Sequence, residues 1–238
     1  MKAALVAAAL AAAAGLLILA GAGEFLPELL RGTLVTLQVA AGGALLAVAA
    51  ALVAALARLY GPAPLRWLAT GYVETFRGTS ALVQLFWLFF VLPHFGVTLA
   101  PITVGIVALE LNIGAYGAEV VRGAIGAVPP GQWEAATALD MDRMQALRRI
   151  VLPQAFVRMI PPWGNLFIEL LKATSLVSLI TLSDLAFKAQ QLNQNTLRTA
   201  EIFGLVLLIY LAISLAITAG MRALERRAAR GLARGRTA

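Results

Sequence analysis

The sequence has no cysteine and a single histidine, His94. Disulfides and thiolate metal or redox sites are therefore excluded, and one imidazole cannot build a metal centre by itself. Each of the three lysines, Lys2, Lys172 and Lys188, follows a residue other than glycine, so the sequence lacks the G-x-x-x-x-G-K phosphate loop of nucleotide hydrolases. We accordingly expect no catalytic residues, no metal site, no cofactor and no ATPase activity of its own.

Charged residues are also scarce. They make up 13% of the 238 residues, whereas hydrophobic residues make up 61%; an average soluble domain is about half apolar and about one-quarter charged. The uncharged runs 33–57 and 202–221 are long enough to cross a hydrocarbon core of about 30 Å, for which about 20 residues suffice. Because long apolar runs differ from the alternating pattern of a membrane β-barrel, we predict an all-α membrane protein.

The apolar runs predict five core spans after an N-terminal apolar segment. That segment, 1–22, is either a retained span or a signal-like peptide, since Met1-Lys2 precedes an apolar run that ends in small residues. Both interpretations place the following residues outside the cytoplasm. The predicted spans are 3–22, 33–57, 79–95, 101–121, 159–182 and 202–221.

The positions of the basic residues orient these spans. Alternating sides places fifteen of the nineteen lysines and arginines in the cytoplasm, as the positive-inside rule requires. The arginines from Arg222 to Arg236 directly follow an apolar span, so we interpret the basic tail, 228–238, as facing anionic lipid headgroups of the bilayer. No aromatic interleaving or recognition motif indicates nucleic acid. The C-terminus is therefore predicted to be cytoplasmic.

A charged, helix-prone insert, 122–158, separates the fourth and fifth spans. Pro129-Pro130-Gly131 interrupts the chain, and the residues 132–139 that follow are rich in helix formers. Glu134 is expected in the first turn of this helix, where a carboxylate suits the helix dipole. Small alanines at 135, 136 and 138 would allow a partner surface to approach closely.

A bend and a second helix are expected to complete the insert. Asp140 can adopt the backbone conformation that a bend requires, and the Asp142 carboxylate can cap a new helix. That helix is expected to run over 143–151 and to end at Leu152-Pro153, so the pair of helices occupies about 131–151.

The insert resembles the EAA motif of bacterial ATP-binding-cassette (ABC) import permeases, in which a coupling helix docks into a groove on the ATPase. The resemblance rests on Glu134-Ala135-Ala136, the bend at Asp140, and Ile150-x-Leu152-Pro153. Other blocks, which resemble the polar amino acid branch with its histidine and glutamine permeases, are Phe76-Arg77-Gly78-Thr79-Ser80, Gly114-Ala-Tyr116-Gly-Ala-Glu119 and Val128-Pro-Pro-Gly131-Gln132.

The resemblance covers roughly residues 28–227. It implies a MetI-like ABC importer transmembrane domain over 23–227, in the bacterial inner membrane. The partners that it implies are a separate ABC ATPase subunit, a second permease subunit, identical or a sibling, and an extracytoplasmic solute-binding protein. Ala136-Thr-Ala-Leu and Leu182-Ser-Asp184-Leu are also similar to permeases for ectoine-type solutes.

Residue by residue, the resemblance assigns the coupling role to one set of positions. The family usually has glycine where this chain has Asp140, so we expect Asp140→Gly to be tolerated and Asp140→Val to uncouple transport from ATP hydrolysis. The coupling set is Glu134, Ala135, Ala136, Leu139, Asp140, Asp142, Arg143, Leu152 and Pro153.

Charged residues at membrane depth are candidates for the substrate pathway, because placing them there is costly unless they face a cavity or a partner. Glu110 lies beside Asn112 in the fourth span, and Glu169 precedes Lys172 by three residues in the fifth. The spacing of the second pair allows two interpretations: a buried ion pair that holds the bundle together, or two charges that line a pathway for a zwitterion.

Two further expectations concern the outer face and the helix contacts. Residues 178–191, with 196–201, should form the outer surface on which a binding protein docks. The glycines at 114 and 117 should permit close helix packing.

Two other classes of function stay open. An ion-coupled secondary transporter could use Glu110, Glu169 and Lys172, but it would not need the coupling insert. A non-transporting membrane scaffold would show no solute-dependent stimulation of an ATPase.

Overall fold

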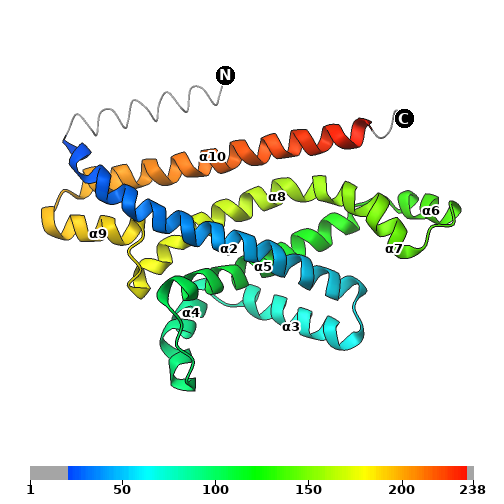
Figure 1. The fold of residues 1–238 in the computed structure, drawn as a ribbon, viewed down its shortest axis with the longest axis horizontal. Helices are drawn as coiled ribbons and strands as arrows, with labels where there is room; N and C mark the ends of the chain where they lie inside the picture. The colour runs from blue at the N-terminus through cyan, green and yellow to red at the C-terminus, as the bar shows by residue number, and fades with distance from the viewer. Residues whose placement is uncertain (1–20, 235–238) are drawn as a thin grey trace. The chain divides into compact units, whose positions relative to one another are not determined.

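The computed structural model describes residues 21–234, and within that range the chain is helical with no β-strand. The predicted span 3–22 lies almost wholly outside the described residues. In chain order, the α-helices are α2 (Leu26–Tyr60), α3 (Ala63–Gly78), α4 (Ala81–Phe86), α5 (Pro101–Gly126), α6 (Pro130–Ala138), α7 (Arg143–Ala146), α8 (Leu152–Ala173), α9 (Leu185–Thr196) and α10 (Thr199–Arg234) (Figure 1).

Shorter helical turns connect several of these helices. Two are π-helices, η2 (Trp87–Val91) and η4 (Leu147–Val151). Three are 3₁₀ helices: η1 (Ala22–Phe25), η3 (Leu92–Phe95) and η5 (Thr174–Ile180).

Four helical stretches among the described residues are long and apolar enough to cross a membrane: Ala22–Tyr60, Pro101–Gly126, Arg143–Ile180 and Thr199–Arg230. A broken pair of helices, α3 followed by 81–95, would make a fifth span if it crosses as one. The predicted span 79–95 is therefore not one α-helix of spanning length: residues 81–95 follow α3 at a bend of 107°. Its apolar run is too short to cross as one α-helix, and Gly96, with φ of 82°, ends it.

Helix α3 is an element that the search for apolar runs did not predict. Pro62, with an extended backbone, is its N-cap, and Pro64 lies in its first turn, where the missing N–H of proline has no cost. Apolar and polar residues alternate around the helix, so the segment has no long apolar run. The last helix, α10, is also longer than predicted, because it continues through 222–234, across the predicted start of the basic tail at 228.

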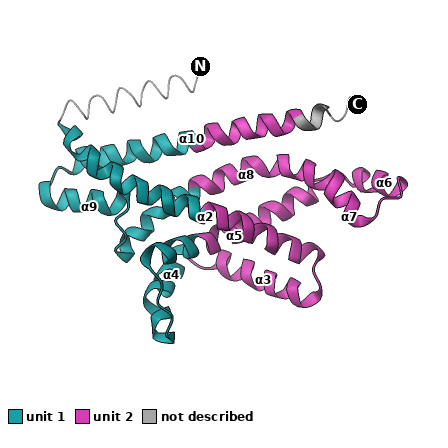
Figure 2. Ribbon diagram, viewed as in Figure 1, with its two compact units in different colours: residues 1–43, 81–109, 169–216 teal, residues 44–80, 110–168, 217–238 magenta. Residues whose placement is uncertain are grey.

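The chain forms two compact units (Figure 2). Unit 1 comprises residues 1–43, 81–109 and 169–216, and unit 2 comprises 44–80, 110–168 and 217–238.

In unit 1, the first turns of α2 pack against α9 and the start of α10. The buried apolar residues of this cluster are Ala22, Phe25, Leu29, Leu185, Ala189, Ile202, Leu205 and Val206. Gly32 allows the close approach, since a Cβ atom there would lie 2.7 Å from the carbonyl oxygen of Asp184. The Thr36 hydroxyl accepts the Leu185 N–H at 3.1 Å, which fixes the start of α9 on α2.

In unit 2, α5 is the central helix, and its glycines permit the close packing that the sequence predicted. A Cβ atom on Gly117 would lie 2.5 Å from the buried Trp163 ring of α8, and one on Gly114 would lie 2.7 Å from the Tyr72 hydroxyl of α3. Tyr72 also donates to the Leu111 carbonyl at 2.9 Å. Close packing at the two glycines and a half-buried hydrogen bond thus hold α3 and α8 to α5.

Candidate functional site

The insert between α5 and α8 begins with α6, which starts earlier than predicted. Pro129 occupies the N-cap and Pro130 the first helical position, where the missing N–H of proline has no cost and its fixed φ suits the helix. Glu134 therefore lies in the second turn, and the prediction that it lies in the first turn is wrong.

The surface of α6 divides the predicted coupling residues into two groups. Glu134 and Ala135 are exposed, and Leu139 keeps 73% of its surface exposed although it is a large apolar residue. Ala136 is only 1% exposed, so it packs inside the insert and does not offer a surface to a partner. Glu134, Ala135 and Leu139 are therefore predicted coupling residues of this segment that a partner can reach.

The bend after α6 has the geometry that the sequence predicted at Asp140. Its φ is 56°, in the left-handed region, which aspartate tolerates better than most residues. The Asp140 N–H donates to the Thr137 carbonyl and the Met141 N–H to the Ala136 carbonyl, both at 3.0 Å. This pair of hydrogen bonds is a Schellman motif, in which Asp140 takes the position that glycine usually occupies.

The predicted cap at Asp142 is confirmed. Its Oδ1 accepts the N–H groups of Met144 and Gln145, each at 2.8 Å, and the Gln145 Oε1 accepts the Asp142 N–H at 3.2 Å. This reciprocal arrangement is a capping box, which satisfies N–H groups that the first helical turn leaves unpaired. The bend is therefore closed from both sides by local hydrogen bonds.

The second insert helix does not end at Leu152-Pro153, contrary to the prediction. Helix α7 passes through the π-turn η4 into α8, so the helical path from Arg143 is continuous. The Leu152 N–H bonds to the Leu147 carbonyl, five residues back, and the wider turn accommodates Pro153, which has no N–H to donate. Leu152 is half-buried and Pro153 exposed.

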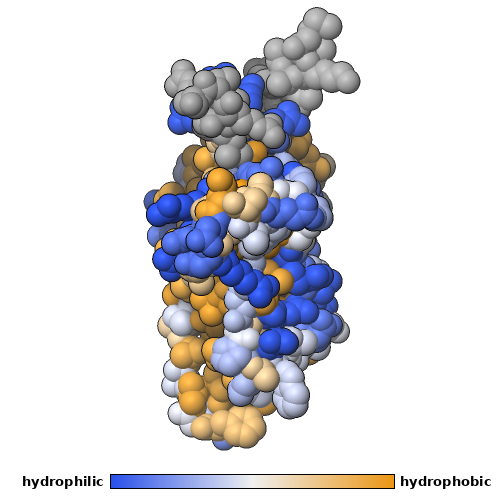
Figure 3. Space-filling model, turned by 90° about the vertical axis from the view of Figure 1, so that its right-hand side faces the viewer, coloured by the Kyte–Doolittle hydropathy of each residue, from blue (hydrophilic) through white to orange (hydrophobic). Residues whose placement is uncertain are grey.

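A side-chain hydrogen bond and a cavity define how α6 lies against the rest of unit 2. Gln154 of α8 donates to the Gln132 side chain of α6 at 3.0 Å. A cavity of about 470 Å³ lies beside α6, and Arg122 and Glu134 are the charged residues that line it. Figure 3 shows hydrophilic side chains gathered on the face that carries α6 and α7.

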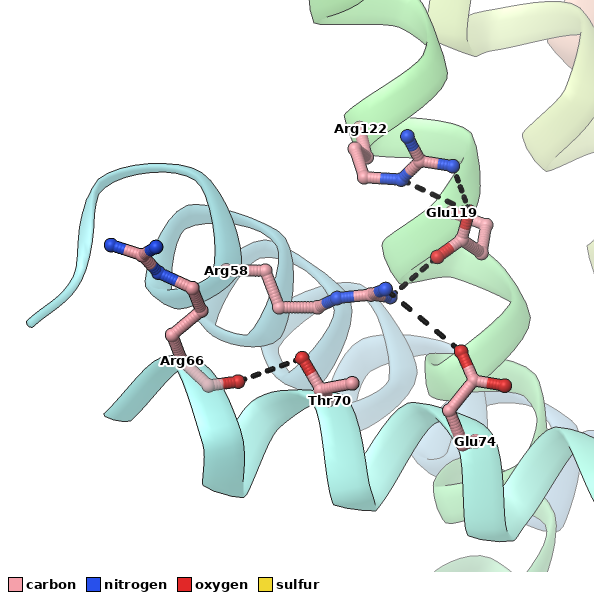
Figure 4. Close-up of polar contacts among 6 residues, drawn as sticks. All are labelled: Arg58, Arg66, Thr70, Glu74, Glu119 and Arg122. Carbon is pink, nitrogen blue, oxygen red and sulfur yellow. Dashed lines mark hydrogen bonds and ion pairs between the residues drawn. The ribbon is translucent and has the colours of Figure 1, made fainter. Parts of the chain in front are cut away.

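A charge network beside the insert was not predicted from the sequence. Glu119 of α5 pairs with Arg58 at the end of α2 and with Arg122 one turn further along α5, both at 2.5 Å, and Glu74 of α3 lies 3.9 Å from Arg58 (Figure 4). The side chains of Arg58 and Glu119 are only 17% and 21% exposed. Arg58 and Glu119 are separated by 61 residues, so no local pattern could have paired them.

The candidate pathway residues have different surroundings. The Asn112 amide is buried and donates to the Phe76 carbonyl at 2.9 Å, which gives it a structural role at the end of α3. Glu110 is half-buried and has no hydrogen bond or ion pair among the residues that the structure describes. Glu169 and Lys172 are both exposed, and within the described range no ion pair joins them, so the buried-pair interpretation is wrong.

The fold and the insert together define an all-α membrane protein whose apolar helices are interrupted by a rigid hydrophilic helix, bend and helix. A family model described as "Binding-protein-dependent transport system inner membrane component" matches residues 47–230, and the chain belongs to this family.

Individual relatives agree with this assignment. The chain is 54% identical over 160 residues to the probable amino-acid ABC transporter permease protein y4tF of Sinorhizobium fredii, covering 65% of this chain and 67% of that protein. It is 42% identical over 185 residues to the L-cystine transport system permease protein TcyB of Bacillus subtilis, covering 77% and 79%. A solved structure described as an amino acid ABC transporter with histidines is similar with a TM-score of 0.81 and 34% identity, covering 86% of this chain and 95% of that one.

Proposed function

We propose that this chain is the membrane-spanning permease subunit of an ABC importer that moves polar amino acids or related zwitterionic solutes across the inner membrane. The observation that carries the proposal is the bend at Asp140, closed by a Schellman motif on one side and a capping box on the other. Such a bend holds the exposed face of α6 in a fixed orientation, which a docking element requires.

The coupling role follows from how the insert is joined to the spans. Glu134 and Leu139 would contact the ATPase, and the cavity beside Glu134 leaves room for a side chain of that partner. A displacement of α6 would pass through the bend into the continuous helix that begins at Arg143. Closure of the ATPases on ATP would in this way change the access of the membrane pathway.

The remaining partners are a second permease subunit and a solute-binding protein. Glu169 and Lys172, which are exposed and unpaired among the described residues, supply the two signs of charge that a zwitterion needs, so we assign them to the pathway; Glu110 is a further candidate. The binding protein would dock on the extracytoplasmic surface around α9, where Lys188 pairs with Glu28 and Arg198 with Glu24. The C-terminus would then be cytoplasmic.

The test is reconstitution of the chain with its ATPase in liposomes that enclose ATP. Thermal-shift screening of the binding protein against polar amino acids and ectoine first identifies the cargo. We expect uptake of that cargo that requires ATP, and ATP hydrolysis that the loaded binding protein stimulates. Uptake driven by membrane potential without the ATPase would indicate an ion-coupled transporter, and the absence of any stimulation would indicate a scaffold.

A variant tests the docking surface directly. Glu134→Ala should weaken retention of the ATPase on the purified permease by about ten-fold, the effect of losing one charge-assisted contact at an interface. Glu225→Ala, in α10, removes the same charge away from the insert and should leave retention unchanged. Equal retention by both variants would contradict the role of Glu134.

A further inference from the structure

A second cavity of unit 2, of about 340 Å³, lies between the end of α2 and the start of α7. Arg66 of α3 and Arg143 of α7 line it, together with Tyr60 at the end of α2. The other lining residues are apolar, namely Leu59, Met144 and Leu147. The volume is near the lower end of the range for ligand sites, about 300–1,000 Å³, and suits a headgroup-sized molecule.

Neither arginine of this cavity has a carboxylate partner among the described residues. Arg66 donates to the Gly61 carbonyl at 3.3 Å, and Figure 4 shows its guanidinium pointing away from Glu74 and Glu119. The Arg143 guanidinium lies 5.6 Å from the centroid of the Tyr60 ring, a cation–π contact that leaves its N–H groups available. Two positive charges therefore line one small cavity, which favours an anion.

The carboxylate next to Arg143 in the chain does not neutralise this charge. The Asp142 Oδ1 accepts the N–H groups of Met144 and Gln145, so the carboxylate is directed at the start of α7. Its position is fixed by the capping box, and no ion pair joins it to Arg143 within the range that the structure describes.

The residues around Arg66 indicate where the anion comes from. Its neighbours in α3 are exposed apolar side chains: Leu65 is 51% exposed, Trp67 78% and Leu68 72%. A surface that meets water or a soluble partner rarely leaves a tryptophan and two leucines open together. Tryptophan beside leucine and arginine is typical of the level at which a membrane meets water.

We propose that this cavity binds the phosphate group of an anionic phospholipid from the leaflet next to the insert. The phosphate would accept hydrogen bonds from Arg66 and Arg143, and the acyl chains would lie along the exposed leucines and Trp67 of α3. Because Arg143 is the first residue after the capped bend, the bound lipid ties α3 to the insert. The proposal rests on the proposed membrane orientation and not on transport or its cargo.

The test measures lipid binding by native mass spectrometry on the full-length chain, purified with the subunits that accompany it. The protein is equilibrated with equal amounts of phosphatidylglycerol and phosphatidylcholine that carry the same acyl chains. We expect selective retention of phosphatidylglycerol. Each arginine should contribute roughly five-fold, the gain typical of one basic side chain at an anionic membrane surface, so Arg66→Gln with Arg143→Gln should lower retention by roughly 25-fold.

Matched controls separate this site from general charge effects. Arg148→Gln with Arg149→Gln removes the same charge from η4, outside the cavity, and should keep the selectivity, and Arg66→Lys should keep most of it. Gel-filtration and circular dichroism profiles identify variants that fail to fold. If the double variant fails to fold, the difference in phosphatidylglycerol retention between Arg66→Lys and Arg66→Gln tests the proposal in its place.

Three results would overturn the proposal. The first is unchanged phosphatidylglycerol retention in the folded Arg66→Gln, Arg143→Gln variant. The second is displacement of the lipid by millimolar inorganic phosphate or glycerol phosphate, which would indicate a site for a soluble anion. The third is a loss of ATPase retention by the Arg66→Gln, Arg143→Gln variant while its lipid retention stays intact. That result would indicate that the cavity receives a protein side chain. Because the readout is lipid binding, failure to transport amino acids would not affect it.

Discussion

The two compact units use their charged residues differently. Unit 1 is held near α9 by ion pairs with more exposed members: Arg198 pairs with Glu24 and Glu201, and Glu28 pairs with Arg31 and Lys188. Unit 2 shares one carboxylate, Glu119, between two arginines from different helix positions, and the central pair is about one-fifth exposed. Exposed ion pairs contribute about 0–1 kcal/mol, whereas removing one partner of a buried pair is far more costly. Removing a charge from the Glu119 network of unit 2 should therefore lower stability more than removing a charge from the exposed pairs of unit 1.

The interior of unit 1 contains a buried carboxyl group, Asp184, whose surroundings differ from those of Glu119. Asp184, the N-cap of α9, is fully buried, and its Oδ2 has no hydrogen-bond partner among the described residues. Burial raises the pKa of the Asp184 carboxyl to about 6, although N–H groups at the start of α9 act against this shift. Unit 2 thus compensates Glu119 with two arginines, whereas in unit 1 no ion pair reaches Asp184 within the described residues.

The largest expected effect is at the bend of unit 2. Asp140→Val places a β-branched residue at a φ of 56°, which costs about 1–3 kcal/mol locally and should open the Schellman motif. We expect ATP-driven uptake in reconstituted liposomes to fall by more than ten-fold, while the ATPase alone keeps its activity. Asp140→Gly is the control and should retain uptake. A valine variant with full uptake would remove the coupling role of this bend.

The second effect concerns the shared carboxylate. Glu119→Gln leaves the half-buried Arg58 without its main partner, so we expect a loss of about 3 kcal/mol in the free energy of unfolding, measured by denaturant titration in detergent. Glu74→Gln, which removes an exposed carboxylate 3.9 Å from the same arginine, should cost less than about 0.5 kcal/mol. Equal losses of unfolding free energy in the two variants would show that Glu119 contributes no more to the network than Glu74 does.

The third prediction uses the buried carboxyl of unit 1. The folded state holds the Asp184 proton up to about pH 6 and the unfolded chain releases it near 3.8, so stability should fall as pH rises from about 4 to 6 and then level off. Asp184→Asn keeps the cap acceptor and removes the charge. We expect it to flatten this pH dependence and to raise stability at pH 7.5 by about 2 kcal/mol, since one pKa unit is about 1.4 kcal/mol and a buried amide still lacks a partner.

Asp184→Ala serves as the comparison, because it removes the charge together with the cap. Thermal unfolding of the three proteins between pH 4.5 and 8 separates the two contributions. An asparagine variant with the same pH profile as the original chain would assign the dependence to another group.

The smallest effect is expected at the exposed pairs of unit 1. Glu24→Gln should lower stability by about 0.5 kcal/mol at low salt and by less at 1 M salt, where exposed pairs are screened. Unfolding curves at the two salt concentrations test this. A loss as large as that of Glu119→Gln would erase the difference between the units.

The sequence predicted best where the cause of the structure is local. Asp140 at the bend and Asp142 at the cap depend on backbone preferences within a few residues, and both were predicted. The start of α6 was misplaced by two residues because the prediction used helix formers and did not use Pro130 as a first helical residue. Helix α3 was missed because apolar runs do not reveal an amphipathic helix.

Contacts between distant segments could not be predicted in the same way. The pairing of Arg58 with Glu119 depends on the packing of α2 against α5, which no single pattern encodes. The spacing of Glu169 and Lys172 allowed an ion pair. In the folded chain both side chains are exposed and unpaired among the described residues. Spacing along a helix sets what is possible, and tertiary packing selects among the possibilities.

The π-turn η4 has a consequence for the register of the helix that follows it. A π-turn holds one residue more than an α-turn, so every side chain of α8 is rotated by about 100° from the direction that an uninterrupted α-helix would give it. The one additional residue in the π-turn 147–151 thus determines that the side of α8 with Trp163 packs against Gly117. Removing that residue would leave the composition of the span unchanged and turn a different side of it toward α5.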